Sequence, residues 1–432
     1  MSGWTSSRAR GTAGLTLALL AVAGSARATS QSLFGYGPRD VALAQADVAD
    51  ASSACAAYVN PAFAVASGTR VAIGYGHGWT KLELDGMDAG VRDIAGTDLA
   101  LQLGSTLSED MALGGAVNLH LPNRSLARIA FSPGTEPVFV RFDPASQRTT
   151  ADAVVAIRYA GLSLGVGASL LVSAEGQVDF LLGQDGNGPY ADGETDVSLP
   201  YELAPIAGLA ADLGPAAVAL RYRGAQSVDL DLGTKAMVEV QGNPLNGVTH
   251  VAVSGASGYV PATVDASARW SPSHGLRLMS ALQLARWSRA PSPAADLTMD
   301  VDLGLSPGQR EGRFVRPAYR DTLSPRVGLE VLPGGLTSKW ALRAGYAFTP
   351  SPIPDPKGFA SPADAPTHTF ALGAGLSFGL VGGVDLRADA AGQFVKLQTR
   401  TFDKGEDTIP FARYEAGGYV GVANVSLEGT WR

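Results

Sequence analysis

Apolar and polar residues alternate along most of the chain, from about residue 70 to the C-terminus. Residues 264–270, VDASARW, are a clear example, because every second position is apolar and the positions between carry Asp265, Ser267 and Arg269. A period of two indicates a β-strand whose two faces meet different surroundings. The pattern therefore predicts an all-β protein.

The connections between these segments separate two architectures. In a soluble sandwich the polar face of each strand meets water, whereas in a transmembrane barrel the apolar face meets lipid and the polar face lines the lumen. Clusters of Gly, Pro, Asn and Asp mark short links near residues 108–110, 160–161, 214–215, 271–275, 333–338 and 381–383. Long connections cover roughly residues 83–96, 121–150, 183–195, 232–258, 288–320, 350–366 and 401–414.

Short and long connections alternate strictly along the chain. Outer-membrane barrels have this layout, because their periplasmic turns are short and their extracellular loops are long. Aromatic residues near strand ends, such as Trp79, Trp270 and Trp431, fit the girdles of such barrels. We therefore predict a transmembrane antiparallel β-barrel of about 14 strands, an even number as in bacterial single-chain barrels.

Composition agrees with a barrel and argues against two other classes. Charged residues make up 17% of the chain, and 53 of its 432 residues are Gly. Beyond the N-terminal region, the sequence contains no apolar stretch of about 20 residues that could cross a bilayer as a helix. The net charge of −7 argues against nucleic acid as a partner, since nucleic-acid-binding proteins present a basic face.

The first 28 residues have the three parts of a secretory signal peptide. Arg8 and Arg10 come first, the apolar run GTAGLTLALLAVAG follows, and Ala26-Arg27-Ala28 is a small-residue cleavage site. We expect residues 1–28 to be removed by cleavage after Ala28. The single cysteine, Cys55, does not directly follow that site as a lipid-anchored cysteine would, and we predict that it is a small buried residue.

An Ala-rich segment, GYGPRDVALAQADVADASSACAAYVNPAFA, precedes the first predicted strand. Near the C-terminus stands GYAFTPSPIPDP, followed by His368 before FALGAGLSF, and the chain ends on an alternating strand. In this order the features resemble the FadL-type outer-membrane transporters of long-chain fatty acids and aromatic hydrocarbons. The sequence departs from that family in ending on Trp431-Arg432 instead of a terminal aromatic residue, and in its Pro-rich loops.

The resemblance implies a barrel plugged by an N-terminal hatch, with a lateral gap beside a distorted third strand. Carried over by position, the hatch covers residues 29–68 and the barrel covers residues 69–432. The third strand runs from about Met111 to Leu121, and its Gly114-Gly115 pair is the candidate kink and lateral gate, since Gly weakens strand pairing. The alternative is that this pair only eases the curvature of the barrel.

The tripeptide Asn60-Pro61-Ala62 closes the Ala-rich segment. Asn-Pro breaks a helix and favours extended geometry in the preceding residue. We predict that Asn60, Pro61 and Ala62 form the rigid corner where the hatch meets the barrel, in contact with the third-strand kink. The alternative is a simple turn before the first strand.

The connection 121–150 is unusually rich in large apolar residues for a loop. An apolar ligand that arrives from water needs an exposed apolar landing site, because removal of its surface from water drives binding. The candidate hydrophobic capture loop consists of Leu126, Phe131, Phe139 and Phe142. The alternative is that the loop packs on itself as a lid.

A fatty acid also carries a carboxylate, which Arg binds well in surroundings of low dielectric constant. Strand parity places Arg158, Arg221, Arg223, Arg269, Arg326, Arg343 and Arg387 in the lumen. Lumen carboxylates such as Asp265 and Glu330 are expected to pair with most of them. The candidate partners for a headgroup are Arg158, Arg221, Arg269 and Arg343.

The sequence shows no catalytic motif. Its five His residues are scattered, without the spacing of metal ligands, and it has no G-x-S-x-G elbow. An active site assembled by Ser, His and Asp from different strands would leave no such local motif, and no candidate stands out. We therefore predict no catalytic residue, no metal and no cofactor, and we do not expect an enzyme.

Together these features predict a bacterial outer-membrane protein for the passive uptake of long-chain fatty acids or other hydrophobic small molecules, through a plugged barrel with a lateral exit. Its expected partners are the hydrophobic ligand and the lipid and lipopolysaccharide of the outer membrane, and we expect a monomer. Two alternatives are a structural or surface-interaction barrel without transport, and a general porin.

Overall fold

A computed structural model describes most of the chain. The described residues are 22–23, 29–65, 68–123, 132–133, 137–142, 148–172, 175–185, 188–198, 201–240, 247–291, 296–302, 308–312, 318–335, 338–355, 361–405 and 411–431. The predicted signal peptide lies outside them, except for the two-residue strand β1 (Val22–Ala23). Cleavage after Ala28 and the exact bounds of the hatch and the barrel therefore stay predictions.

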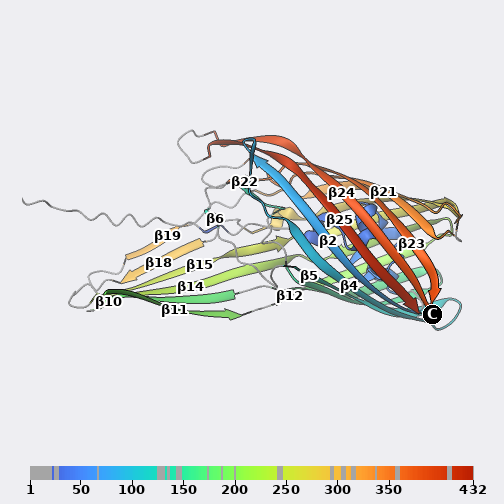
Figure 1. The fold of residues 1–432 in the computed structure, drawn as a ribbon, viewed down its shortest axis with the longest axis horizontal. Helices are drawn as coiled ribbons and strands as arrows, with labels where there is room; N and C mark the ends of the chain where they lie inside the picture. The colour runs from blue at the N-terminus through green and yellow to red at the C-terminus, as the bar shows by residue number, and fades with distance from the viewer. Residues whose placement is uncertain are drawn as a thin grey trace, which may run out of the picture.

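Fourteen long strands of the described chain form one closed antiparallel β-barrel (Figure 1). In sheet order, which is also chain order, they are β2 (Gly68–Leu84), β4 (Ile94–Thr106), β5 (Met111–Pro122), β8 (Thr150–Tyr159), β9 (Leu162–Val172), β12 (Tyr201–Asp212), β13 (Ala216–Arg223), β16 (Thr263–Ser273), β17 (Leu276–Ala285), β20 (Thr322–Val331), β21 (Trp340–Thr349), β23 (Thr367–Val381), β24 (Val384–Asp403) and β25 (Arg413–Trp431). Pairing of β25 with β2, from Trp431 opposite Thr69 to Ala416 opposite Leu84, closes the sheet. The predicted strand number is confirmed, and a soluble sandwich is excluded.

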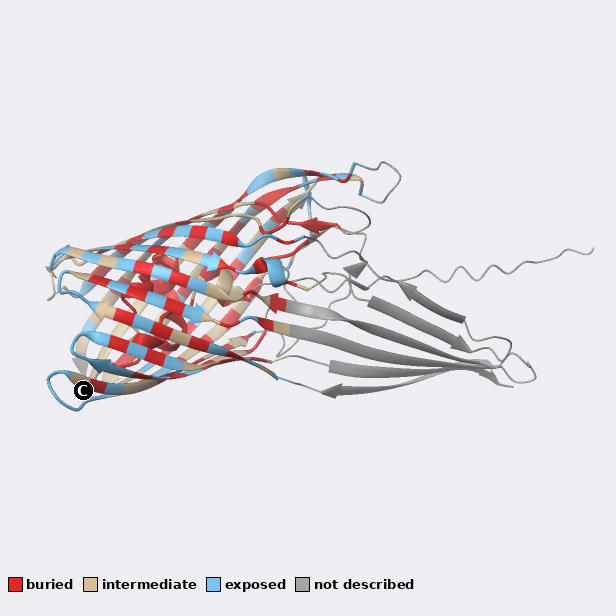
Figure 2. Ribbon diagram, turned by 180° about the vertical axis from the view of Figure 1, so that it is seen from behind, coloured by how far each residue is buried: buried red, intermediate tan, exposed pale blue. Residues whose placement is uncertain are grey.

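Buried and exposed residues alternate along the barrel strands, as expected when one face meets the lumen and the other the outer surface (Figure 2). On β13, for example, Ala217, Ala219 and Arg221 are buried, whereas Val218 and Leu220 are exposed. Exposure of large apolar side chains recurs on strands all around the barrel. An outer face of this kind suits lipid and would be costly in water. No helix within the described ranges is long and apolar enough to cross a membrane.

The N-terminal segment 29–65 lies inside the barrel, and we call it the plug. It contains α1 (Ser30–Phe34), α2 (Gly37–Ala42), η1 (Asp47–Ala49), α3 (Ala56–Val59) and η2 (Pro61–Phe63). Helix α2 contacts β23, β24 and β25, while η2 contacts β8, β9 and β12 across the lumen. Small Ala side chains allow this close packing, and Cys55 is buried among them as predicted. The expected N-terminal plug is thus present.

Several long connections extend the barrel with further strands. A six-stranded sheet consists of β10 (Glu175–Asp185), β11 (Gly188–Ser198), β14 (Gln226–Val240), β15 (Gly247–Val260), β18 (Asp296–Asp302) and β19 (Gly308–Gly312). It projects from the end of the barrel opposite the C-terminus, which we call the loop end (Figure 1). The predicted long connections at 183–195, 232–258 and 288–320 do lie between barrel strands, but each carries paired strands of this sheet and is not a simple loop.

The remaining elements are short. They are β3 (Met87–Asp88), β6 (Ser132–Pro133), β7 (Val138–Phe139), β22 (Pro362–Ala363) and η4 (Trp287–Arg289). Strand β7 pairs with β22, which joins two long connections above the lumen. The plug and the connection that carries β7 border a cavity in the lumen.

Candidate functional site

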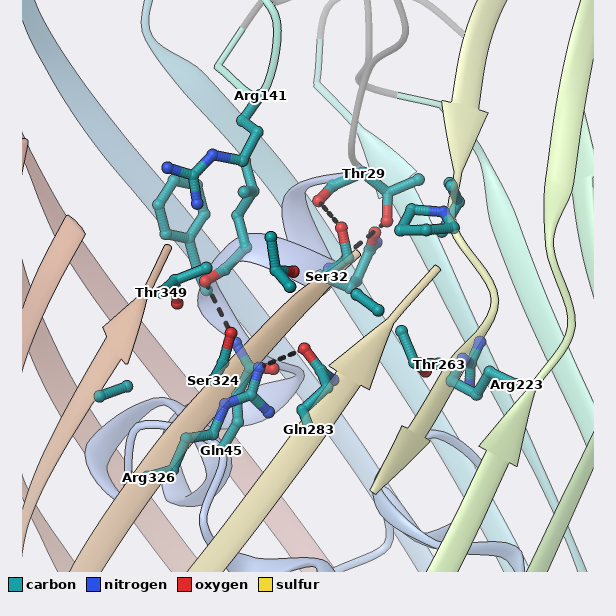
Figure 3. Close-up of a pocket in the computed structure, with 18 of the residues that line it drawn as sticks. Thr29, Ser32, Gln45, Arg141, Arg223, Thr263, Gln283, Ser324, Arg326 and Thr349 are labelled. Atoms are coloured by element: carbon teal, nitrogen blue, oxygen red, sulfur yellow. Dashed lines mark hydrogen bonds between the residues drawn. The ribbon is translucent and has the colours of Figure 1, made fainter. Parts of the chain in front are cut away.

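A cavity of about 100 Å³ lies between the plug and the loop end of the barrel (Figure 3). Its walls come from the plug, from the loop ends of several strands, and from the connection that carries Arg141 and Phe142. The apolar part of the lining includes Leu33, Phe34, Phe142, Val260, Trp287 and Val395. The cavity therefore offers an apolar environment within the lumen.

The charged part of the lining has one sign. Among the described residues it includes four arginines, Arg141, Arg221, Arg223 and Arg326, and neither Asp nor Glu. The carboxylates that pair with three of these arginines, Asp152, Asp265 and Asp364, are not among the lining residues. A cavity with apolar walls and arginine at its edge suits a ligand with an apolar body and an anionic group.

Arg221 holds the plug to the barrel. Its guanidinium donates to Asp265 Oδ2 at 2.9 and 3.0 Å, and its Nη1 donates to the carbonyl oxygens of Tyr58 and Val59 at 3.2 and 3.0 Å. These bonds use donors along both edges of the guanidinium. Arg221 is therefore engaged mainly in holding the plug to the barrel wall.

Arg223 and Arg141 also have partners of their own. Arg223 Nη2 lies 2.8 Å from Asp152 Oδ1, and its guanidinium stacks over the ring of Tyr58 at 4.6 Å. Arg141 Nε donates to Asp364 Oδ1 at 2.8 Å. Each of these two positive charges is therefore balanced by one carboxylate.

Arg326 has a buried donor without a hydrogen-bond partner among the described residues. Its Nη2 donates to Gln283 Oε1 at 2.7 Å. This hydrogen bond is drawn as a dashed line in Figure 3. Its Nη1 lies 3.7 Å from Asp265 Oδ1, is buried, and makes no hydrogen bond to the described residues. Since Asp265 already pairs with Arg221, the three groups together carry one net positive charge. Arg326 is one of the residues that line the cavity.

The arginines singled out from the sequence fall into different places. Arg221 lines the cavity, whereas Arg343 is buried between Glu330 and Asp389 at 2.7 and 2.6 Å. The structure places Arg269 3.7 Å from a carboxylate oxygen of Asp50, and Arg158 exposed at the end of β8. Parity had put Arg326 in the lumen, but nothing in the sequence distinguished it, because its free donor depends on how Asp265 is shared.

A buried ion network joins the plug to the opposite wall. Arg39 of α2 donates to Asp47 at 2.8 Å, to Asp50 at 3.1 Å and to Glu330 of β20 at 3.2 Å. Glu330 also accepts from Arg343 of β21 at 2.7 Å. Removal of one member of such a network leaves buried charges unpaired, which is strongly destabilising. The plug is therefore tied to the wall by charge as well as by packing.

The predicted hatch corner lies on the side of the plug that meets β9 and β12. Asn60 Nδ2 donates to the Val48 carbonyl at 2.9 Å, and Asn60 Oδ1 accepts from the Ala62 amide at 3.0 Å. A Cβ atom built on Gly208 would lie 1.9 Å from Asn60 Oδ1, and one on Gly165 would lie 2.3 Å from Pro61 C. Asn60, Pro61 and Ala62 thus occupy a corner that glycines in the wall make possible.

The Gly114-Gly115 pair has a different role from the expected one. Strand β5 pairs with β4 and with β8 through both positions without a register shift. A Cβ on Gly114 would lie 2.0 Å from the carbonyl oxygen of Ala64. The pair therefore forms no kink in this structure, and the expectation of one is corrected: Gly114 lets the plug approach the third strand.

The ladder is interrupted instead between β20 and β21. Their pairing ends at Arg326 opposite Ala347, and the two chain segments meet again where Arg320 N donates to Pro352 O at 2.9 Å. Pro325 is the next residue of β20 beyond this last pair, toward the loop end. As a proline it has no N–H to donate to the ladder. We call Thr322–Pro325 of β20 and Phe348–Thr349 of β21 the β20–β21 interval.

The β20–β21 interval lies between the cavity and the outer surface. Thr322, Ser324 and Thr349 line the cavity, whereas Leu323 and Pro325 are exposed on the outer face. At its loop end, the carboxylate of Asp321 accepts a hydrogen bond from the Ser288 amide at 2.8 Å, which lowers the pKa of Asp321.

The candidate capture loop is only partly described. Leu126 and Phe131 lie outside the described residues. Phe139 and Phe142 are buried in a cluster with Phe402 and Tyr414, and Phe142 also lines the cavity. The described part of this connection packs as a lid, which was the alternative, so neither Phe139 nor Phe142 is an exposed landing site.

Several solved structures match this chain along nearly its whole length. No protein-family model matches the sequence, and the search of curated proteins found no match. A FadL homologue of Pseudomonas aeruginosa is 13% identical, with 95% of this chain and 99% of that chain covered and a TM-score of 0.52. The toluene transporter TodX of P. putida is 13% identical, with 93% and 99% covered and a TM-score of 0.53. The toluene transporter TbuX of Ralstonia pickettii is 11% identical, with 93% and 99% covered and a TM-score of 0.52.

At these identities the match concerns the architecture. The match spans 93–95% of this chain, so it concerns the fold as a whole and not one part of it. The plugged barrel of the FadL-type outer-membrane proteins, which the sequence resembles, is therefore the fold of this chain.

Proposed function

We propose that the protein is an outer-membrane channel for the passive uptake of hydrophobic molecules that carry a carboxylate, with long-chain fatty acids as the model ligand. The observation that carries the proposal is the cavity, whose lining, as far as the described residues go, combines apolar walls with four arginines and no carboxylate. Arg326 supplies the headgroup partner, because its Nη1 has no hydrogen-bond acceptor among the described residues.

The cavity favours an acid over a bare hydrocarbon. Transfer of an apolar chain from water into the cavity gains about 25 cal/mol per Å² of buried surface. A hydrocarbon would leave the charge of Arg326 uncompensated in the lumen, whereas a carboxylate pairs with it. The toluene transporters share the fold of this chain, and we infer a different ligand class here from the arginines.

The plug fits a selective channel better than a general porin. Its helices contact strands on opposite sides of the lumen, and Arg39 and Arg221 tie it to both walls. Passage therefore requires either a movement of the plug or an exit through the wall. We place the exit at the β20–β21 interval, because there the cavity is separated from the outer surface by strands that do not pair.

The surroundings of the channel follow from its outer face. The exposed apolar side chains of the barrel meet the lipid and lipopolysaccharide of a bacterial outer membrane, which the chain reaches through its signal peptide. We infer that one chain suffices for the channel, since cavity, plug and proposed exit all belong to one barrel.

Binding to the purified protein tests the proposal. Trp287 lines the cavity, so a brominated fatty acid should quench its fluorescence, and Trp287→Phe identifies the contribution of this residue to the signal. The acid should bind at least about tenfold more tightly than its methyl ester, as expected for a charged hydrogen bond. Arg326→Gln should abolish that difference, while Arg326→Lys should keep part of it.

Two results would contradict the proposal. Equal affinity for the acid and the ester would show that Arg326 does not bind the carboxylate headgroup. Equal uptake of labelled fatty acid by cells with and without the protein would favour a structural or surface-interaction barrel.

A further inference from the structure

Three side chains form a chain of hydrogen bonds where the plug meets β4 and β5. Asp98 Oδ1 lies 2.7 Å from His120 Nδ1, and His120 Nε2 lies 3.3 Å from Ser30 Oγ. The sequence had indicated only scattered histidines, because these residues come from a helix and two strands. The order Ser, His, Asp is that of a hydrolytic triad.

The wall fixes the orientation of the imidazole. Asp98 and His120 are directly opposite each other in the β4–β5 ladder, and both side chains are buried in the lumen. A Cβ on Gly96 would lie 2.3 Å from the His120 ring, so the glycine at this position provides the space that the ring occupies. Because Nδ1–H donates to the Asp98 carboxylate, Nε2 is left as the acceptor for the hydroxyl of Ser30.

A second observation points to a ligand. Ser30, His120 and Asp98 line a cavity together with Gln31, and the side chain of Gln31 is 3% exposed. Its Nε2 and Oε1 have no hydrogen-bond partner among the described residues. A buried amide without a partner is costly, and an amide N–H beside a nucleophile can stabilise an oxyanion.

The cavity around these groups is small, about 40 Å³, and partly apolar. Phe34, Ile94 and Val422 contribute apolar walls. Ser30 is only half-buried, so a ligand in the lumen can reach it. Gln31 and Phe34 also line the larger cavity, which makes the two spaces neighbours.

We propose that Ser30 and His120 are catalytic residues of an esterase for acyl esters with an apolar chain, and that Asp98 is the positioning residue of His120. Ser30 Oγ attacks the acyl carbon, and its proton passes to His120 Nε2. As the carbonyl re-forms, the C–O bond of the ester breaks, and the leaving alcohol takes that proton. Gln31 Nε2–H donates to the oxyanion of the tetrahedral intermediate.

Water completes the reaction. His120 Nε2 accepts a proton from water, whose oxygen attacks the acyl carbon, and Ser30 Oγ leaves with the proton restored. The net reaction converts one ester and one water into one acid and one alcohol. The acid forms beside the arginines of the larger cavity, but the hydrolysis itself does not depend on transport.

A fluorophosphonate probe on the purified full-length barrel tests the triad. The probe should form a bond between phosphorus and Ser30 Oγ with loss of fluoride, which mass spectrometry locates on the peptide that contains Ser30. Labelling and hydrolysis of p-nitrophenyl butyrate should fall at least about 100-fold in Ser30→Ala and in His120→Gln. Ser53→Ala, a plug serine outside this cavity, is the matched control and should label like the wild type.

Asp98 needs a separate comparison, because its loss could also disturb packing. Asp98→Asn should lose labelling, and Asp98→Glu should restore part of it, while heat-modifiable migration on gels shows that each barrel is folded. An unlabelled wild-type protein would overturn the proposal, as would equal labelling or equal ester hydrolysis in Ser30→Ala. Fatty acid binding should persist in Ser30→Ala, so a failure here is distinguishable from a failure of the proposed channel.

Discussion

A Cβ atom on Gly114 would lie 2.0 Å from the carbonyl oxygen of Ala64, so the third barrel strand meets the end of the plug at a position that admits only hydrogen. The same relationship holds between Gly208 and Asn60, at 1.9 Å. The wall is thus shaped to hold one particular backbone path of the plug. Packing of this kind has little room for adjustment, because protein interiors are close-packed.

Gly208→Ala should displace the plug without unfolding the barrel. The added methyl group collides with a buried Asn60 side chain whose own hydrogen bonds fix it, so the corner of the plug has to move. We expect larger and more frequent ion currents in planar bilayers. Gly421→Ala is the matched control, since its nearest non-neighbouring atom would be 3.9 Å away. Unchanged currents in Gly208→Ala would show that the corner does not close the lumen.

Arg39→Ala should loosen the plug by removing its charge connection to β20. The substitution would leave three buried carboxylates, those of Asp47, Asp50 and Glu330, with one cation fewer. We expect this to reduce stability by about 3–5 kcal/mol. Hydrogen exchange of amides in residues 37–50 should therefore speed up, while the strands of the barrel keep their protection. Arg158→Ala, at an exposed strand end, should leave the exchange unchanged. Equal exchange in both variants would contradict a structural role for the network.

Asn60→Ala should impair uptake of labelled fatty acid while the barrel still folds. Asn60 is fully buried, and its loss leaves the Val48 carbonyl and the Ala62 amide without their partners, at about 1–3 kcal/mol for each group. Asn60→Asp keeps the acceptor for Ala62 and should retain part of the uptake. Asn123→Ala removes only an exposed bond to Tyr75 and serves as the control. Full uptake by Asn60→Ala would show that residues 60–62 are only a turn before the first strand.

The sequence predicts the barrel well because each strand separates lipid from lumen, and this separation appears directly as a period of two. The same signal was present in QSVDLDLGTKAMVEV, which forms β14, although this region was expected to be mostly loop. Contacts across the lumen leave no local pattern. Ser30 and His120 are 90 residues apart, and Arg221 and Asp265 are 44 apart, so neither pairing could be predicted from spacing.

A disulfide across the β20–β21 interval should slow release of ligand through the wall. Continuation of the register from Arg326 and Ala347 brings Ser324 opposite Thr349, so a Ser324→Cys, Thr349→Cys pair is suited to a cross-strand bond. We expect oxidation to reduce fatty acid uptake severalfold and a reducing agent to restore it. The pair Val327→Cys, Tyr346→Cys lies within the intact ladder and should have no effect on uptake. Cys55 is buried and does not compete for the bond. If complete cross-linking at 324 and 349 left uptake unchanged, the ligand would have to leave past the plug, and the glycines that hold the plug would be the gate.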